Sequence, residues 1–258
     1  MRVMTLDELK ATLDSFSPVK IEFVARVMES LANPPSANIR AKGTWLTGEA
    51  DWIEYFGLAL SVHHGATIEP LGHSSFETVF RNACEHLRWS IDPPGSRTQR
   101  FVDMVVRPKS GKRRRLSLKS TAAKKLSKSA LHISKLTEAA WIQDVRTARD
   151  RRDRTLELFA QYQRAVTQII MLRAFREDVD TIPQKYQLVE VPVSIFDSIQ
   201  QAPLRAFERD APVIECIVGD RVVAVVAIDR SDAKITVRRI QLSACTVHAE
   251  WDRAADIR

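Results

Sequence analysis

An aspartate and a lysine stand in two neighbouring segments that have the composition of β-strands. Asp103 lies within Phe101-Val102-Asp103-Met104-Val105-Val106, and Lys119 ends Arg115-Leu116-Ser117-Leu118-Lys119. Lys109-Ser110-Gly111-Lys112 between the two segments is typical of a turn, so the pattern predicts a hairpin with both side chains near one another. A carboxylate can bind Mg²⁺, and an ammonium group can position water and stabilise charge on a phosphate. Metal-dependent cleavage of a phosphodiester requires both groups.

A concentrated positive charge surrounds this hairpin. The chain carries a net charge of +7, yet the segment from Arg107 to Lys128 contains basic residues and no acid. Such a block suits a phosphate backbone, because each neutralised phosphate releases counterions. A solvated basic loop is the alternative. The expected DNA-binding residues of this block are Lys112, Arg113, Arg114, Lys124 and Lys125.

Helical patterns precede the hairpin. The stretch from Leu6 to Leu31 indicates two helices that separate around Ser17 and Pro18. Ser74-Ser75-Phe76-Glu77 has the form of a capping box and opens an amphipathic helix. Its apolar positions are Phe76, Val79, Phe80, Ala83, Cys84 and Leu87.

The remainder of the chain predicts a mixed fold. We expect a polar linker over residues 120–129 and a helical region from Ala130 to about Arg176, divided near residues 149–154. Four β-branched runs follow, over residues 186–193, 213–218, 221–228 and 234–247. These elements indicate an α/β fold with a mixed central sheet flanked by helices. We expect one nuclease domain over residues 1–258, helical to about 90, with the hairpin and a helix at about 98–176 and a β-rich part at about 185–250.

The order of these residues resembles the PD-(D/E)XK motif of restriction endonucleases. Asp103 is followed by Ser117-Leu118-Lys119, although no proline precedes Asp103 and Ser117 stands in the place of the usual acid. A group of type II enzymes that read CCGG and CCNGG-type sites is similar in having S-x-K, and it takes the missing carboxylate from a helix. Glu138, in the expected downstream helix, and Glu77, in the upstream one, are the two candidates.

This resemblance implies a restriction-endonuclease-like core and a Mg²⁺-dependent type II restriction endonuclease that cuts double-stranded DNA. Asp103, the Leu118 carbonyl and Glu77 or Glu138 would bind the metal, and Lys119 would orient the attacking water. A homodimer or tetramer follows if the target is palindromic. A repair endonuclease or junction resolvase, and a basic DNA-binding regulator without catalysis, remain alternatives.

Each site residue also has a purely structural interpretation. Asp103 could pair with Arg100 or Arg115, Glu77 could serve only as the third residue of the capping box, and Glu138 could be a surface acid near Lys135. The nuclease interpretation depends on the coincidence of all of them in one order.

A late strand and a group of histidines complete the candidates. Within Lys234–Gln241, we expect Arg239 and Gln241 on one face and Arg238 on the other, as residues that contact bases; exposed strand charges are the alternative. His63, His64 and His73 could suggest zinc, but packing or loop roles are favoured.

Other classes are excluded by what the sequence lacks. The chain contains no Gly-x-x-x-x-Gly-Lys-Ser/Thr, so we expect no nucleotide cofactor. It also contains no apolar run long enough for a membrane span, and its start does not resemble a signal peptide, so we expect a cytoplasmic protein.

Overall fold

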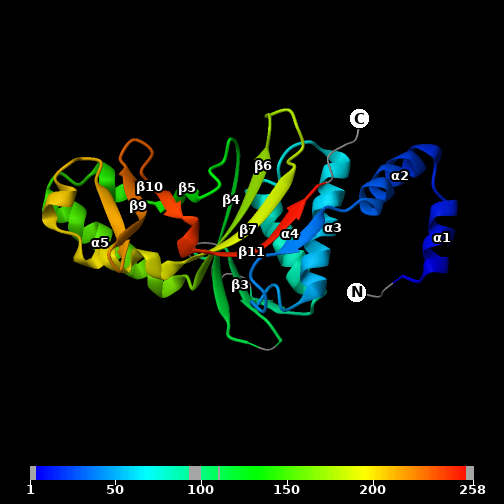
Figure 1. Ribbon diagram of the computed structural model, residues 1–258, viewed down its shortest axis with the longest axis horizontal. Helices are drawn as coiled ribbons and strands as arrows, with labels where there is room; N and C mark the ends of the chain where they lie inside the picture. Colours follow the sequence, from blue (N-terminus) through cyan, green and yellow to red (C-terminus); the bar gives the residue numbers. More distant parts are fainter. Residues whose placement is uncertain (1–3, 93–99, 110, 254–258) are drawn as a thin grey trace.

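A mixed sheet forms the centre of the protein (Figure 1). The computed structural model describes residues 4–92, 100–109 and 111–253. The sheet has seven strands in the order β1-β11-β7-β6-β4-β3-β2. Their bounds are Ser36–Ile39 (β1), Ser90–Asp92 (β2), Met104–Arg107 (β3), Arg114–Lys124 (β4), Gln168–Arg176 (β6), Lys185–Pro192 (β7) and Thr246–Asp252 (β11). Only β4 and β6 pair in parallel; the other neighbouring strands are antiparallel.

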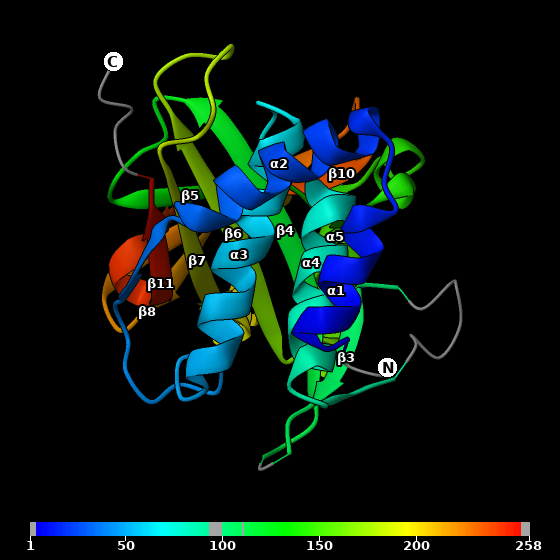
Figure 2. The ribbon, with the colours of Figure 1, turned by 90° about the vertical axis from the view of Figure 1, so that its right-hand side faces the viewer.

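Helices cover one face of this sheet (Figure 2). These are α3 (Ala50–Ala66) and α4 (His73–His86), while α1 (Leu6–Asp14) and α2 (Pro18–Ala32) lie outside them. The apolar residues of α4 recur at helical spacing, and Phe76, Phe80 and Cys84 are completely buried. They pack with Trp52 and Phe56 of α3, so α4 is fixed against the sheet.

A second layer covers the opposite face. It contains α5 (Ala148–Ala165) and a four-stranded sheet in the order β5-β10-β9-β8. The strands are β5 (Ala130–Glu138), β8 (Val213–Val218), β9 (Arg221–Asp229) and β10 (Lys234–Gln241). Short 3-10 helices lie at Ala140–Gln143 (η1), Val193–Gln201 (η2), Leu204–Phe207 (η3) and Leu242–Ala244 (η4). The core between the layers includes Phe159, Tyr162 and Phe196, which are fully buried.

The predicted hairpin is confirmed, but Asp103 lies immediately before β3 rather than within the strand, and the two strands separate there. β3 pairs with β4 only from Met104 opposite Leu116 to Val106 opposite Arg114. Beyond this point β4 runs on to Lys124 and, within the described chain, pairs with β6 alone. Lys119 therefore lies in the middle of β4 rather than at its end, and the first half of the expected linker is strand. The fork leaves one edge of β4 open beside Asp103.

The mixed α/β architecture, the two N-terminal helices and the late strands are also confirmed. The expected helical region from Ala130 to Arg176 is wrong at both ends, where β5 and β6 lie. Leu131 and Ile133 are buried in alternation, but the pairing of β5 with β10 is irregular after Ile133 and the alternation shifts. β6 is buried nearly throughout, and such a continuous apolar run does not distinguish a central strand from a buried helix. The helix between them, α5, buries Thr155, Leu158, Phe159 and Tyr162, which recur at helical spacing.

Two smaller features of the helices complete the fold. The capping box expected at residues 74–77 does not form, because α4 begins at His73 and its N-cap is Gly72, two residues before Ser74. Across the described ranges, the helices lack the length and apolar character needed to cross a bilayer.

Candidate active site

Asp103 anchors the fork between β3 and β4 through its backbone and its carboxylate. Its backbone N–H donates to the Leu116 carbonyl at 2.9 Å. Its Oδ2 accepts a hydrogen bond from the Leu118 N–H at 2.7 Å. In a longer hairpin, a backbone carbonyl of β3 would accept this hydrogen bond instead. Because the N–H and C=O of one strand residue project to the same side, the Leu118 carbonyl also faces this edge. The carboxylate is therefore held rigidly beside an available carbonyl oxygen.

Lys119 meets Asp103 on the open side of the fork. Its Nζ lies 3.5 Å from Asp103 Oδ2, and the two side chains are 16% and 26% exposed. Leu116 and Leu118 point into the core beneath α3 and α4, so Ser117 and Lys119 take the opposite face of β4. Among the described contacts, Asp103 pairs with neither Arg100 nor Arg115, the partners that the structural interpretation had suggested. Arg100 donates to the Glu138 carbonyl, and Arg115 donates to the carbonyls of Ala165 and Arg164 at the end of α5.

Glu77 of α4 joins Asp103 from the other side of the fork. Donor atoms of His73, Glu77 and Asp103 all lie within 4.8 Å of one another. His73 Nε2 and Glu77 Oε1 are 3.0 Å apart across one turn of the helix. Burial raises the pKa of Glu77, the charge of His73 opposes this, and the Asp103 carboxylate adds to it. Two crowded carboxylates beside an imidazole suit a divalent cation, so the residues present fit the expected metal.

Ser117 lies behind Asp103 and is completely buried. Its Oγ donates to Asp103 Oδ2 at 3.3 Å. The fully buried Tyr162 of α5 lies near both residues: burial raises the pKa of its hydroxyl well above the ordinary value, Ser117 counteracts this and Asp103 reinforces it. The position that usually carries an acid is thus closed off from solvent.

Glu138 stands apart from this group. It is the last residue of strand β5. The sequence analysis had placed it on a helix, and this prediction is wrong. Its side chain is 74% exposed, and its Oε1 accepts from Lys135 Nζ at 2.9 Å. This hydrogen bond, together with the charge of Lys135, lowers the pKa of Glu138. Of the two candidate carboxylates, the structure brings Glu77 to Asp103 and leaves Glu138 in a surface ion pair.

The basic residues of the hairpin divide into two sets. Lys112 and Arg113 are exposed before β4, and Arg113 pairs with Asp92 at 3.4 Å. Lys125 is exposed after β4. β4 has 11 residues and so spans about 36 Å, which separates the two ends widely. Arg114 stacks on Trp45, with 4.6 Å from its guanidinium carbon to the ring centroid, and belongs to the protein's own packing.

Arg238 and Arg239 do not take opposite faces of β10, contrary to expectation. The pairing of β10 with β5 is irregular between Val237 and Ile240, and Arg239 adopts a left-handed φ of 52°. This bulge exposes both arginines and places them in the lining of one cavity of about 430 Å³. Thr121 of β4, two residues beyond Lys119, lines the same cavity, and none of its described lining residues is acidic. Gln241 is exposed at the end of β10.

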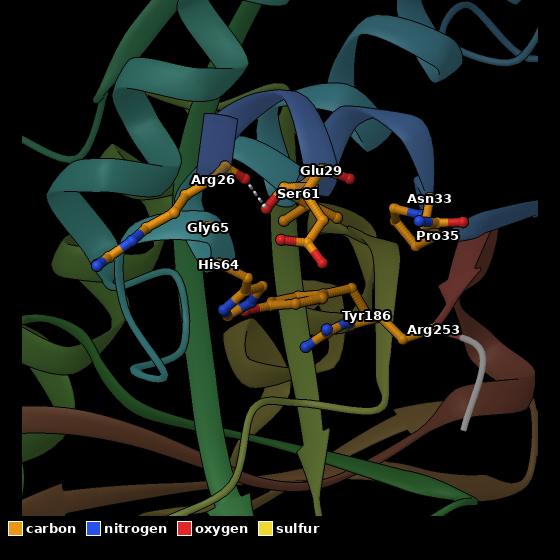
Figure 3. A pocket seen from close by; sticks show the side chains of 11 residues that line it. Arg26, Glu29, Asn33, Pro35, Ser61, His64, Gly65, Tyr186 and Arg253 are labelled. Carbon is orange, nitrogen blue, oxygen red and sulfur yellow. Dashed lines mark hydrogen bonds between the residues drawn. The ribbon is translucent and has the colours of Figure 1, made fainter. Parts of the chain in front are cut away.

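His63 and His64 lie in the last turn of α3, apart from the fork. A cavity of about 330 Å³ between α2, α3 and β7 is lined by His64, Tyr186 and Arg253 (Figure 3). His64 Nε2 lies 2.9 Å from the Tyr186 hydroxyl, and burial lowers the pKa of His64 to about 4. His63 Nε2 bonds the Glu69 carbonyl instead. The packing interpretation of His63 and His64 agrees with these contacts, whereas His73 lies beside Glu77. Its spacing of four residues from Glu77 on an amphipathic helix was the signal that could have linked the two.

Comparison with known proteins adds an independent finding. Residues 9–253 match the family model SmaI, described as type II site-specific deoxyribonuclease. The chain is similar to the type II restriction enzyme SmaI of Serratia marcescens, with 26% identity over 212 residues that cover 78% of this chain and 79% of the relative. No solved structure matches the chain.

Proposed function

Because the chain belongs to the SmaI family of type II site-specific deoxyribonucleases, we propose that Asp103, Glu77 and Lys119 form the site at which it cuts duplex DNA. The protein is a restriction endonuclease, an enzyme that hydrolyses DNA at a specific sequence. The observation that carries the assignment of the site is the meeting of three segments at one fork: the residue just before β3, the middle of β4 and the first turns of α4.

The residues at the fork divide the work. Asp103 and Glu77 would hold a divalent cation, expected to be Mg²⁺, with the Leu118 carbonyl as a further oxygen donor. When bound, this ion supplies Lewis acidity at a phosphate oxygen. Lys119 would orient the attacking water and stabilise charge on the phosphate. Its ion pair with Asp103 holds the ammonium group in position before substrate arrives.

The two ends of β4 support a path for the DNA. Lys112 and Arg113 stand at one end and Lys125 at the other, with Lys119 between them. Duplex DNA lying along this direction would meet positive charge on both sides of the cleavage site. The same arrangement makes Lys124 a candidate by position.

Arg238 and Arg239 are the candidates for reading bases. They line a cavity whose described lining residues include no acid. Thr121 lines the same cavity and lies on the same face of β4 as Lys119. An arginine can donate two hydrogen bonds to guanine in the major groove. Gln241, exposed at the end of the same strand, is a further candidate.

If the target is palindromic, cleavage of both strands would call for two copies of the chain. Each copy contains one fork and would cut one strand. The apolar faces of α1 and α2 suit such an interface, because neither helix has a buried residue and Val19 and Phe23 are 76% and 63% exposed. A DNA substrate also fits the expected cytoplasmic location.

The test is cleavage of a sequenced plasmid in Mg²⁺. Wild-type protein should give discrete bands, and EDTA should abolish them. Asp103→Asn, Glu77→Gln and Lys119→Met should each lower the cleavage rate by at least about a hundredfold, since each removes a ligand or a charge at the reacting phosphate.

Glu138→Gln is the matched control. It removes an acid that the sequence alone made an equal candidate, but one that lies in a surface ion pair. Its cleavage rate should stay within about threefold of wild type, because exposed ion pairs contribute little. If Glu138→Gln lost activity while Glu77→Gln kept it, the assignment of the second carboxylate would be wrong.

A further inference from the structure

The imidazole of His73 stands beside the two carboxylates of the fork. We propose that His73 is a third protein ligand of the cation held by Glu77 and Asp103, an inference that rests on the proposed function. Its nitrogen makes the site bind Mn²⁺ in preference to Mg²⁺. The resemblance to restriction endonucleases assigned His73 no role.

The distances suit direct ligation. Around an octahedral ion with bonds of about 2.1 Å, adjacent donor atoms are about 3.0 Å apart. His73 Nε2 and Glu77 Oε1 are separated by 3.0 Å. The Asp103 oxygen completes a group whose members all lie within 4.8 Å, so small side-chain rotations suffice to bring all three to one ion.

The position of His73 keeps it available to an ion. It is the first residue of α4, one helical turn before Glu77, so both side chains lie on the same face of the helix. The two side chains are 49% and 35% exposed, which gives a hydrated cation access to them. The contact of 3.0 Å between His73 Nε2 and Glu77 Oε1 turns the ring toward Glu77 before the ion binds.

The other histidines of the described chain are engaged elsewhere or stand apart from the carboxylates. His248 bonds Glu190, and His86, at the far end of α4, stacks on Tyr55 with ring centroids 4.7 Å apart. Within the described residues, the one group that joins histidine to clustered acids contains His73.

Ligand chemistry links this geometry to metal choice. Mg²⁺ is a hard ion that prefers oxygen and dehydrates reluctantly, whereas transition-metal ions accept imidazole nitrogen readily. A nitrogen donor therefore strengthens binding of Mn²⁺ more than binding of Mg²⁺. If His73 served only to orient Glu77, its loss would weaken both ions in the same proportion.

Mn²⁺ itself is the probe for the test. Pulsed electron paramagnetic resonance on the full-length protein with one equivalent of Mn²⁺ should show coupling to a directly bound nitrogen. Labelling histidine with ¹⁵N should convert that signal from ¹⁴N to ¹⁵N. His73→Gln should remove it, and Mn²⁺ affinity should fall at least tenfold while Mg²⁺ affinity falls by less than threefold. His86→Ala, on the same helix, should change neither value.

The outcomes separate this proposal from the site assignment. Mn²⁺ bound without a histidine nitrogen, with equal losses of both ions in His73→Gln, would overturn ligation by His73 and leave the fork intact. Mn²⁺ binding that survives in Asp103→Asn and Glu77→Gln would instead overturn the fork as the metal site. The labelling result in wild-type protein does not depend on whether any variant folds.

Discussion

Ser117 occupies the strand position that carries an acid in the PD-(D/E)XK motif. The residue is completely buried near Asp103 and the Tyr162 hydroxyl, where a charged group would lose its hydration. Glu77 approaches from α4 and brings a carboxylate to the exposed side of Asp103. In the proposed site, the Glu77 carboxylate from the helix would therefore take the metal-binding role that a strand acid has in the motif.

Substitution of Ser117 tests this assignment. Ser117→Ala should slow cleavage by less than tenfold, since it removes one hydrogen bond of 3.3 Å to Asp103 and adds no charge. Ser117→Asp should slow cleavage more than a hundredfold, because a second buried carboxylate against Asp103 raises the pKa of the pair and disfavours metal binding. Single-turnover cleavage rates measure both. A Ser117→Asp enzyme that equals or exceeds wild type would contradict this account.

At this scale, part of the site could be predicted from the sequence. The pairing of Asp103 with Lys119 follows from hairpin geometry, which depends on local alternation and a turn. The choice of Glu77 over Glu138 could not be predicted, because it depends on which element packs at the fork. The sequence analysis placed Glu138 on a helix, whereas the residue ends strand β5 of the four-stranded sheet.

Among the elements, β10 shows how an irregularity can redirect side chains. A regular strand would place Arg238 and Arg239 on opposite faces, but the bulge brings them to one cavity. The sequence contains no glycine there to mark the bulge, so strict alternation gave the wrong arrangement. Left-handed φ at a non-glycine residue costs about 1–2 kcal/mol, so the packing around the bulge must offset this cost at Arg239.

Arg239→Gly separates the folding role of this residue from its recognition role. The glycine relieves the backbone strain but increases the entropy of the unfolded chain, so the free energy of unfolding should change by less than about 1 kcal/mol. Binding to the specific DNA site should weaken by about 1–3 kcal/mol, with non-specific binding less affected. Titration of labelled DNA in Ca²⁺ measures this loss.

Arg221→Ala is the control for charge. It removes one positive charge from the exposed start of β9, outside the cavity that Arg239 lines. Its specific binding should stay near that of wild type. Equal losses in the two variants would mean that Arg239 contributes only to the general electrostatic attraction.

The pairing of β7 with β11 carries a pH-dependent interaction. Although burial raises the pKa of Glu190, hydrogen bonds from His248 and Gln168 outweigh it and lower the pKa overall. His248 Nε2 lies 3.1 Å from Glu190 Oε2, and Gln168 donates to Oε1 at 2.8 Å. A lowered acid pKa contributes stability above the unfolded value, about 4.3, and this contribution is lost as pH falls through the folded value.

Glu190→Gln should therefore flatten the pH dependence of stability. Urea unfolding of wild-type protein should show a free energy that falls as pH decreases below about 5, and the variant should lose part of that slope. Glu215→Gln, an exposed acid on β8, should keep the wild-type slope. Parallel curves for wild type and Glu190→Gln would argue against this contribution.

In the whole molecule, two layers cover the opposite faces of the seven-stranded sheet (Figure 1). The fork lies where β3 stops pairing with β4. The mixed class was predictable because alternation, helical periodicity and turn residues are local signals. The second sheet was not, because β5 is bulged and its partners lie far along the chain. Burial on both faces similarly removed the alternation that would have identified β6.

Assembly is tested at the exposed face of α2. Phe23→Asp introduces charge at an apolar position that is already exposed in one chain, so the monomer should keep its fold. If two copies associate through this face, light scattering should show a dimer for wild type and a monomer for the variant. Double-strand cleavage should then give way to nicking. A dimer that persists in Phe23→Asp would place the interface elsewhere.

The central claim is that a divalent cation binds at the fork between β3 and β4. It is tested most directly by the anomalous scattering of Mn²⁺ in crystals of the enzyme with a DNA duplex that contains its site. We predict a strong anomalous peak within bonding distance of Asp103 and Glu77, with Lys119 facing the phosphate beside it. A peak at Glu138, or none near Asp103, would contradict the account.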